Sequence, residues 1–297
     1  MAAELHFAVK PLPEETRTTM TARRLFNVHA HIHADTDVPA QVKEWASWGC
    51  VKWCALAMSA RWQPPHATYL GNDGVLKWMR EFPEVIIGMG AVELGEPMSD
   101  PDDISRLKDL GFRGLKFITP SYPYDDDRYL PLYERAEELG MPILFHAGYA
   151  TCAGAADRAR RLSGENMRVF RLDRVARSFP ELRIIAAHLG LPHAEDALCM
   201  AMKHPHFYLD MCGGGGGKTH RSLIKRAMAP FPGADMSNPE ENLALQYFRK
   251  MVFATDNPSV SVWYPAAEEI MDYLRIPEET RQLFYWGNAA EIFGIEG

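Results

Sequence analysis

The chain has 297 residues, 47% of them hydrophobic, and a formal net charge of -7. This length and apolar content suit one large α/β domain, or two ordinary domains, with a sizeable core. The charges are scattered without a basic run, which argues against nucleic-acid binding, and no apolar run approaches the roughly 20 residues of a membrane-spanning helix. We therefore expect neither a nucleic acid nor a membrane as a partner.

The N-terminal region and the cysteines bear on location. Residues 1–24 lack the apolar stretch of a signal peptide and are predicted to form a polar arm before a single domain of residues 25–297. The five cysteines are odd in number and lack the paired spacing of zinc sites. Together these features favour a reducing, cytoplasmic location.

Short apolar runs alternate with amphipathic runs along the domain. Strands are predicted at 24–31, 51–59, 84–94, 112–119, 141–148, 181–190, 206–213 and 251–258. Helices are predicted at 38–49, 73–83, 100–111, 127–140, 165–180, 192–205, 238–250 and 261–275, with a helical tail at 277–294.

The predicted strands are continuous apolar runs rather than alternating ones, which is typical of parallel strands covered on both faces. Eight strand–helix units predict an α/β fold of the closed, eight-stranded (β/α)8 type, the TIM barrel, with a C-terminal helix. An open doubly wound sheet is the alternative. It would usually have a glycine-rich turn after its first strand, and the run NVHAHIHAD is no such turn.

Polar residues stand at the C-terminal ends of most predicted strands, where barrel enzymes place their chemistry. These residues are His29, His31, Glu93, Lys116, His146, His188 and Asp256. A barrel brings all its strand ends to one mouth, and imidazole with carboxylate suits a divalent transition metal. The sequence therefore predicts a metal site at the mouth.

The first strand carries three histidines at alternate positions, His29, His31 and His33. Residues i and i+2 of a strand point the same way, so a His-x-His pair can hold one ion. Three such residues span roughly 13 Å, at about 3.3 Å per residue, which is too far for one ion. We expect two of the three to bind and the third to do something else.

Six motifs in chain order resemble the amidohydrolase superfamily, and more narrowly the amidohydrolase-related branch that includes aminocarboxymuconate-semialdehyde decarboxylase. They are FNVHAH, GFRGLKF, PILFHAG, IIAAHLG, VFATDNP and YWGNAAEIFG, and the resemblance covers residues 25–295. It implies a metal-dependent enzyme on a (β/α)8 barrel.

The resemblance also implies roles for individual residues. The family has an Asp two residues before its His-x-His pair, and Asn27 at that place selects His29 and His31 as ligands. His146 would be the third protein ligand and Asp256 the fourth, the latter also catalytic. His188 would be the general acid or base acting on a metal-bound water, whose pKa is near 7.

Four further residues are predicted to contact substrate: Lys116, His33, Arg61 and Tyr122. Other branches of the superfamily use a carboxylated lysine on the fourth strand to bridge two metals. The alternatives are that Lys116 faces an anionic substrate or pairs with Glu93. His33 is expected beyond the metal, at the mouth, where it faces substrate or has a structural role.

Two reactions remain open at this point. One is hydrolysis of a small carboxylate, lactone or amide substrate by a metal-activated water. The other is non-oxidative decarboxylation (a carboxy-lyase reaction) or hydration of an aromatic or unsaturated acid. Either needs one divalent ion, with zinc expected first and manganese, iron or cobalt as alternatives. The expected partner is a small-molecule substrate, and base rates favour a homodimer.

Overall fold

Seven parallel strands form one curled sheet in the computed structural model, which describes residues 23–64, 67–213, 217–229, 233–235, 238 and 240–296. The strands pair in chain order, and each lies beside the next one along the chain. They are β1 (Leu25–Ala30), β2 (Cys50–Leu56), β3 (Ile86–Ala91), β4 (Gly114–Phe117), β5 (Ile143–Phe145), β6 (Ile184–Ala186) and β7 (Phe207–Leu209).

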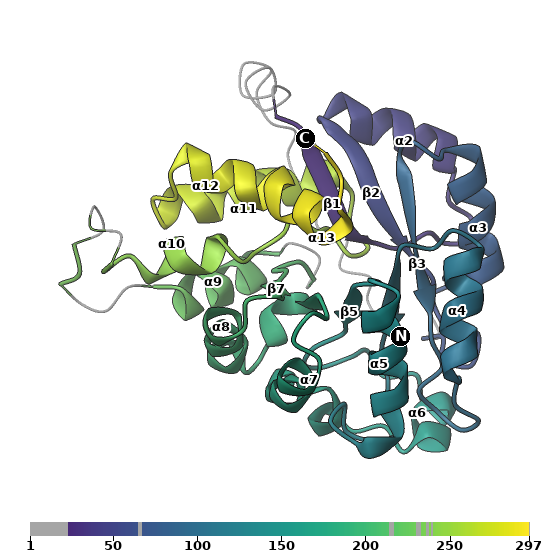
Figure 1. Cartoon of the computed structure of the whole chain (residues 1–297). Coiled ribbons are helices and arrows are strands. Elements are labelled where there is room, and N and C mark those ends of the chain that lie inside the picture. Colours follow the sequence, from purple (N-terminus) through teal and green to yellow (C-terminus); the bar gives the residue numbers. More distant parts are fainter. Residues whose placement is uncertain are drawn as a thin grey trace.

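Helices connect the strands and cover the outer side of the sheet, as α2, α3 and α4 do beside β1–β3 (Figure 1). The α-helices are α2 (Val38–Ser47), α3 (Asn72–Glu81), α4 (Pro101–Asp109), α5 (Leu130–Glu138), α6 (Ala155–Arg160), α7 (Leu172–Ser178), α8 (Ala194–Lys203), α9 (Lys218–Ala227), α10 (Leu243–Phe248), α11 (Val260–Tyr273), α12 (Glu278–Gln282) and α13 (Asn288–Phe293). Shorter turns of helix are η1 (Asp127–Tyr129), η2 (Gly164–Met167), η3 (Val169–Arg171), η4 (Ala187–Gly190) and η6 (Leu283–Gly287). Among the described residues, no helix is long and apolar enough to span a membrane.

Residues 251–256, called the seam below, take the place of the predicted eighth strand without forming a regular strand. Met251 makes an isolated parallel bridge with Leu209 of β7, and Asp256 makes another with Ala30 of β1. Backbone hydrogen bonds also join the seam to both of these strands. The described part of the chain therefore has seven strands, not the predicted eight, and the seam lies between the first and the last.

The local backbone explains why the seam is irregular. Asp256 has a positive φ of 64°, which turns the chain out of the extended conformation. Pro258 follows two residues later and has no N–H to continue a ladder. The apolar run before Asp256 is strand-like in sequence, but its end is a turn.

Helix ends follow the capping rules at several positions, and α4 shows this best. The Asp100 side chain accepts a hydrogen bond from Asp103 N (3.0 Å), and the Asp103 side chain accepts one from Asp100 N (3.0 Å). Pro101 begins the helix, where its missing N–H costs nothing. Gly111 follows the helix with a φ of 96°, which confirms the predicted end.

Other helix predictions need correction. The predicted helix at 165–180 is divided into η2, η3 and α7, because Arg168 has an extended backbone (ψ 128°). Helices α6 and α9 were not predicted. Both matter for the site, because they carry side chains that the periodicity of the sequence did not place.

Most of the predicted N-terminal arm, residues 1–22, lies outside the described residues. The last two residues of the arm are held against the C-terminal helices. Arg23 forms ion pairs with Glu268 of α11 (2.6 Å) and with Glu278 of α12. The Arg24 guanidinium lies 3.8 Å from the centre of the Trp286 ring, a cation–π contact. Ion pairs and a cation–π contact therefore hold the segment before β1 against the C-terminal helices.

A buried ion pair joins the loops at the other end of the sheet. Arg160 of α6 contacts Glu93 through two nitrogens, at 2.6 and 2.8 Å, and also donates to Thr119 O and to Ser59 Oγ. The Glu93 side chain also accepts from Ser59 Oγ (2.6 Å). Arg160 therefore connects the segments that follow β2, β3 and β4.

Replacing Glu93 tests this connection. Burial alone would raise the pKa of Glu93, but the hydrogen bonds from Arg160 and Ser59 outweigh it and lower the pKa below its ordinary 4.5. Breaking a buried pair leaves a charge unpaired, so Glu93→Gln should lower the free energy of unfolding by about 3 kcal/mol at pH 7. Urea unfolding of the variant and the wild type measures this.

The loss of stability caused by Glu93→Gln should be full at neutral pH and should shrink as pH falls. A carboxylate with a lowered pKa stabilises the fold above its ordinary pKa, and the contribution is lost as pH falls through the lowered value. The exposed pair Arg135–Glu138 supplies the control, because Glu138→Gln should cost under about 1 kcal/mol. Equal and pH-independent costs for the two variants would contradict the assignment.

Candidate metal centre

Three potential ligand atoms come together from His29 of β1, His31 just after β1 and Asp256 of the seam. Asp256 Oδ1 lies 3.6 Å from His29 Nε2 and 3.5 Å from His31 Nε2. The three ligand atoms all lie within 4.8 Å of one another. The structure therefore brings together three of the four residues that were predicted to bind a metal.

Hydrogen bonds decide which ring nitrogens are free. His31 Nδ1 lies 3.3 Å from the carbonyl oxygen of Leu56, and His29 Nδ1 lies 2.9 Å from Asp210 Oδ2. A carbonyl or an ionised carboxylate can only accept, so each Nδ1 carries a proton and donates it. Each Nε2 keeps its lone pair, and both face Asp256. This is the arrangement that a metal ion requires.

Burial keeps the two rings neutral. It lowers the pKa of His29 to about 4, with a further contribution from the nearby Lys116. Burial also lowers the pKa of His31 well below the ordinary histidine value. A protonated imidazole cannot bind a metal, so neutral rings at pH 7 fit the proposed ligands.

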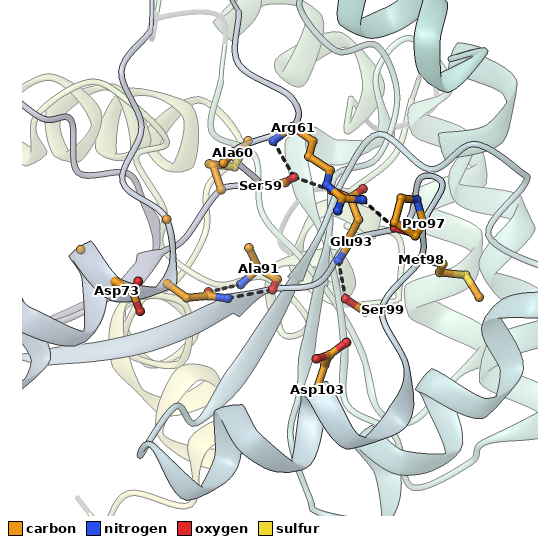
Figure 2. A pocket seen from close by; sticks show the side chains of 14 residues that line it. Ser59, Ala60, Arg61, Asp73, Ala91, Glu93, Pro97, Met98, Ser99 and Asp103 are labelled. Carbon is orange, nitrogen blue, oxygen red and sulfur yellow. Dashed lines mark hydrogen bonds between the residues drawn. The ribbon is translucent and has the colours of Figure 1, made fainter.

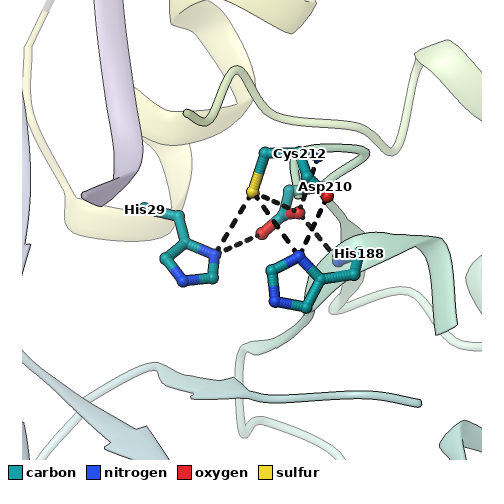
Figure 3. A group of neighbouring side chains, drawn as sticks. All are labelled: His29, His188, Asp210 and Cys212. Carbon is teal, nitrogen blue, oxygen red and sulfur yellow. Dashed lines mark hydrogen bonds and ion pairs between the residues drawn. The ribbon is translucent and has the colours of Figure 1, made fainter. Parts of the chain in front are cut away.

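A second group of side chains, His29, His188, Asp210 and Cys212, also has its ligand atoms within 4.8 Å (Figure 3). Here the polar atoms already satisfy one another. His188 Nδ1 donates to Cys212 O (2.9 Å), and Asp210 Oδ1 accepts from the backbone N–H groups of His188 (2.8 Å) and Cys212 (3.1 Å). The group formed by His29, His31 and Asp256 is therefore the better metal site.

A cavity of about 420 Å³ opens beside this centre. Its lining comes from the strand ends, from the segments that follow them and from α9: His146, Ala147, Tyr149, Thr151, His188, Leu191, Pro192, Gly213, His220, Leu223 and Asp256. The His188 ring lies 5.2 Å from the His29 ring, centroid to centroid. Because Nδ1 of His188 is bound to a carbonyl, Nε2 is the nitrogen left free to exchange a proton.

His146 also lines the cavity, but its ring is held differently. Its Nε2 lies 3.3 Å from Tyr149 O, so Nε2 carries the proton and Nδ1 is free. The ring centre is 4.6 Å from that of His188. His146 belongs to neither of the two groups of ligand atoms found among the described residues. Its role as third protein ligand stays a prediction.

Lys116 is buried at the end of β4, and its Nζ lies 3.3 Å from His29 Nε2. Burial lowers the pKa of Lys116 to about 8, opposed by the nearby carboxylates of Asp256 and Asp210. The ammonium is thus largely charged at pH 7 and balances these two acids. Glu93 pairs with Arg160 instead, so the predicted alternative of a Lys116–Glu93 pair is wrong.

Unusual backbone conformations gather at the strand ends of the site. His188, Leu189 and Asp256 have positive φ values of 59°, 52° and 64°. Gly213 has a φ of 107°, and a Cβ added there would stand 2.8 Å from His188 Nδ1. Such conformations are costly for residues other than glycine and are typical of functional sites. Gly213 leaves the space in which the His188 ring is held.

Asn27 replaces the aspartate of the family pattern and is fully buried. Its Nδ2 donates to Thr255 Oγ1 (2.9 Å), and its Oδ1 accepts from His29 N (3.2 Å). Asn27 therefore joins β1 to the seam just below the ligands. Asn27 is both donor and acceptor here, whereas an ionised aspartate could only accept.

His33 lies one step beyond the two ligand candidates. Its Nε2 is 3.1 Å from Asn257 Oδ1, and its ring centre is 4.6 Å from that of Tyr69. Tyr69 also contacts the His31 ring, at 4.8 Å. His33 is in neither group of ligand atoms within the described chain. Its expected contact with substrate stays a prediction.

Arg61 and Tyr122 lie outside the lining of the cavity beside His188. Arg61 lines a different cavity, of about 700 Å³, and donates to Pro97 O at 2.9 Å (Figure 2). The Tyr122 ring lies 3.9 Å from the guanidinium of Arg128, and its hydroxyl faces Glu96. These positions do not show whether Arg61 or Tyr122 contacts substrate, so that role stays a prediction for both residues.

Three residues of the site were missed in the sequence. Asp210 and Cys212 follow β7, and Asp210 obeys the same rule of a polar residue at the end of an apolar strand. Burial opposes the charge of Asp210, but His29 and His188 hold its pKa below the usual range. His220 of α9 lines the cavity, and its Nε2 contacts Met211 O (3.0 Å).

Comparison with known families finds one match. The model of the family described as Amidohydrolase matches residues 53–295, which is more than half of the chain. The match begins within β2, so it does not include His29 or His31. No curated protein matches the sequence significantly.

Solved structures share the fold at low identity. An uncharacterised TIM-barrel protein from Bordetella bronchiseptica is 16% identical, with a TM-score of 0.63 over 91% of this chain and 99% of that chain. A probable 2-pyrone-4,6-dicarboxylic acid hydrolase from Acinetobacter baumannii, with citric acid bound, is 12% identical, with a TM-score of 0.60 over 92% and 100%.

A third similar structure is a decarboxylase. The 5-carboxyvanillate decarboxylase from Novosphingobium aromaticivorans, complexed with manganese and 4-hydroxy-3-methoxy-5-nitrobenzoic acid, is 15% identical, with a TM-score of 0.59 over 92% and 97%. These likenesses place the curled sheet among TIM-barrel folds. They cover both hydrolases and decarboxylases, so they do not select a reaction.

Metal content should depend on two of the three clustered histidines. We expect about one divalent ion per wild-type chain, since three or four protein ligands complete a single site. His29→Ala and His31→Ala should each remove most of it, because each deletes a ligand. Elemental analysis of the purified proteins measures this.

His33→Ala is the matched control, because it removes an imidazole from the same segment without removing a ligand candidate. Its metal content should equal that of the wild type. If His29→Ala retained its metal and His33→Ala lost it, the binding pair would be His31 and His33 instead.

Proposed function

The chain belongs to the amidohydrolase family, and we propose that it is a metal-dependent hydrolase acting on a small carboxylate, lactone or amide substrate. The observation that carries the proposal is the convergence of His29, His31 and Asp256 beside the free nitrogen of His188. The proposed partner is a small molecule. A cytoplasmic location and a homodimer stay predictions.

The residues that would hold the metal are His29, His31 and Asp256, with His146 proposed as a further ligand. Nitrogen and oxygen donors of this kind suit zinc first, and also manganese, iron or cobalt. When bound, such an ion acts as a Lewis acid that polarises a carbonyl group and lowers the pKa of a water. The neutral rings and their unprotonated Nε2 atoms fit this use.

His188 is proposed as the general base and acid. Its Nδ1 is held by Cys212 O, so the ring cannot turn without losing that hydrogen bond. Its free Nε2 can take a proton from the attacking water and return it to the leaving group when the C–O or C–N bond breaks. Asp256 also lines the cavity and can accept a hydrogen bond from the same water.

The cavity walls limit what the substrate can be. Leu191, Pro192 and Leu223 supply apolar surface, and Tyr149 adds a largely exposed ring at the edge. A volume of about 420 Å³ suits a small molecule with one flat or apolar part. The polar residues of the lining would orient the group that reacts.

Decarboxylation is the second candidate, and the apolar wall is the observation that favours it. An aromatic acid could lie with its ring against Leu191 and Leu223 and its carboxylate toward Asp256 and the histidines. The C–C bond would break with its electron pair left on carbon, and His188 would supply the proton that replaces carbon dioxide. The manganese-containing decarboxylase of similar fold supports the comparison.

One assay distinguishes the two reactions. The enzyme, supplied with zinc or manganese, is incubated with a panel of lactones, aryl amides and hydroxylated benzoic acids. Hydrolysis gives an acid from a lactone or amide without gas, because water adds to the carbonyl group. We expect this result, and release of carbon dioxide as the main activity would favour the carboxy-lyase instead.

A His188 variant connects the activity to the site. His188→Asn should lower the rate on the best substrate by about 10²- to 10⁴-fold, because it removes the proton-transfer group. Its metal content should stay that of the wild type. His206→Asn is the control, since His206 precedes β7 at the opposite end of the sheet. Equal rates in both variants would contradict the role of His188.

A further inference from the structure

Asp210 stands directly after β7, and both oxygens of its fully buried carboxylate are occupied (Figure 3). Oδ1 accepts from His188 N (2.8 Å), Cys212 N (3.1 Å) and Cys212 Sγ (3.0 Å). Oδ2 faces His29 Nδ1 at 2.9 Å. One carboxylate thus contacts a proposed metal ligand and the backbone of the proposed general base.

The two oxygens cannot exchange their partners freely. Two backbone N–H groups point at Oδ1, and backbone donors are fixed by the path of the chain. Oδ2 is therefore committed to His29. Because a carboxylate has no proton to give, the hydrogen bond between them exists only when His29 carries its proton on Nδ1.

We propose that Asp210 is a positioning residue that fixes His29 in its metal-binding tautomer and holds the backbone of His188 at the cavity. The proposal rests on the proposed metal centre. With Nδ1 protonated, His29 Nε2 must be a lone pair, and that atom is the one beside Asp256. On the other side, the hydrogen bond to His188 N secures a backbone with a φ of 59°.

Replacing Asp210 with asparagine would reverse the tautomer of His29. The two backbone N–H groups require an acceptor, so the amide oxygen must take the place of Oδ1. The amide nitrogen then faces His29 Nδ1 and donates to it. His29 must accept there, its proton moves to Nε2, and the metal-binding lone pair is lost. The same logic explains the loss of function when the orienting aspartate of a serine-protease triad becomes asparagine.

The test is Asp210→Asn, an exchange of nearly the same shape that keeps the two backbone hydrogen bonds. Zinc and manganese affinities are measured by competition with a chelator. We expect affinity about 10- to 100-fold below that of the wild type, the usual effect of losing an outer hydrogen-bond partner of a metal ligand. Unchanged affinity would overturn the proposal.

Cys212→Ala is the matched control, because it removes the thiol beside Asp210 and leaves the backbone N–H in place. Its affinity should stay within about twofold of the wild type, since the carboxylate keeps His29 and both backbone donors and loses only the thiol. A large loss in this variant would mean that Asp210 and Cys212 bind the metal directly. That outcome also overturns the proposal.

The tautomer itself can be observed without any metal. Nitrogen NMR of the histidine-labelled, metal-free protein, with the His29 signals assigned by a His29→Gln variant, reports which ring nitrogen carries the proton. We expect Nδ1 in the wild type and Nε2 in Asp210→Asn. A wild-type proton on Nε2 overturns the proposal even if the variant does not fold.

The two readouts separate this proposal from the proposed function. A wild-type protein that binds neither zinc nor manganese would defeat the metal-dependent function. The NMR result would then still decide whether Asp210 sets the tautomer. Normal metal binding in both the wild type and Asp210→Asn would leave the function intact and defeat the role of Asp210.

Discussion

A buried negative charge is the constraint on which this site depends. The Asp210 carboxylate lies in the interior, where water does not solvate it, and such a charge is tolerated only when hydrogen bonds satisfy it. Its donors come from β1 through His29, from the end of β6 through His188 and from the segment after β7 through Cys212. Satisfying one charge therefore sets the relative positions of three parts of the wall, and it leaves Nε2 of His29 as the unprotonated nitrogen of that ring.

Much of the site could be predicted because the rules involved are local. A strand alternates its side chains, so the spacing of His29 and His31 places both on one face. Parallel strands end at one edge, so Asp256 could be expected near them, and its resemblance to a family motif supports the same place. Asp210 obeys the same rule of strand ends and could have been recognised from the run 206–213. The alternation of apolar runs was likewise enough to predict a parallel α/β fold.

The rest depends on contacts between distant segments. Glu93 could pair with Lys116 or with an arginine, and the choice is decided by α6, a helix that periodicity did not indicate. His220 faces the cavity only because α9 packs there. The seam has an apolar, strand-like sequence, but the positive φ of Asp256 arises from its tertiary position. In each case the missing information is a long-range geometry that no window of sequence contains.

The irregular seam suggests a structural role for the proposed metal. Along the rest of the wall, neighbouring strands pair over several consecutive residues, whereas the seam is joined to β1 and β7 by isolated bridges and backbone hydrogen bonds without forming a strand. The proposed ligands lie on the two sides of one of these junctions, with His29 on β1, His31 just after it and Asp256 on the seam. An ion shared between them would link the two sides of this junction and add to the backbone hydrogen bonds that already cross it. Joining the two ends of the sheet and holding the substrate would then be two consequences of the same bonds.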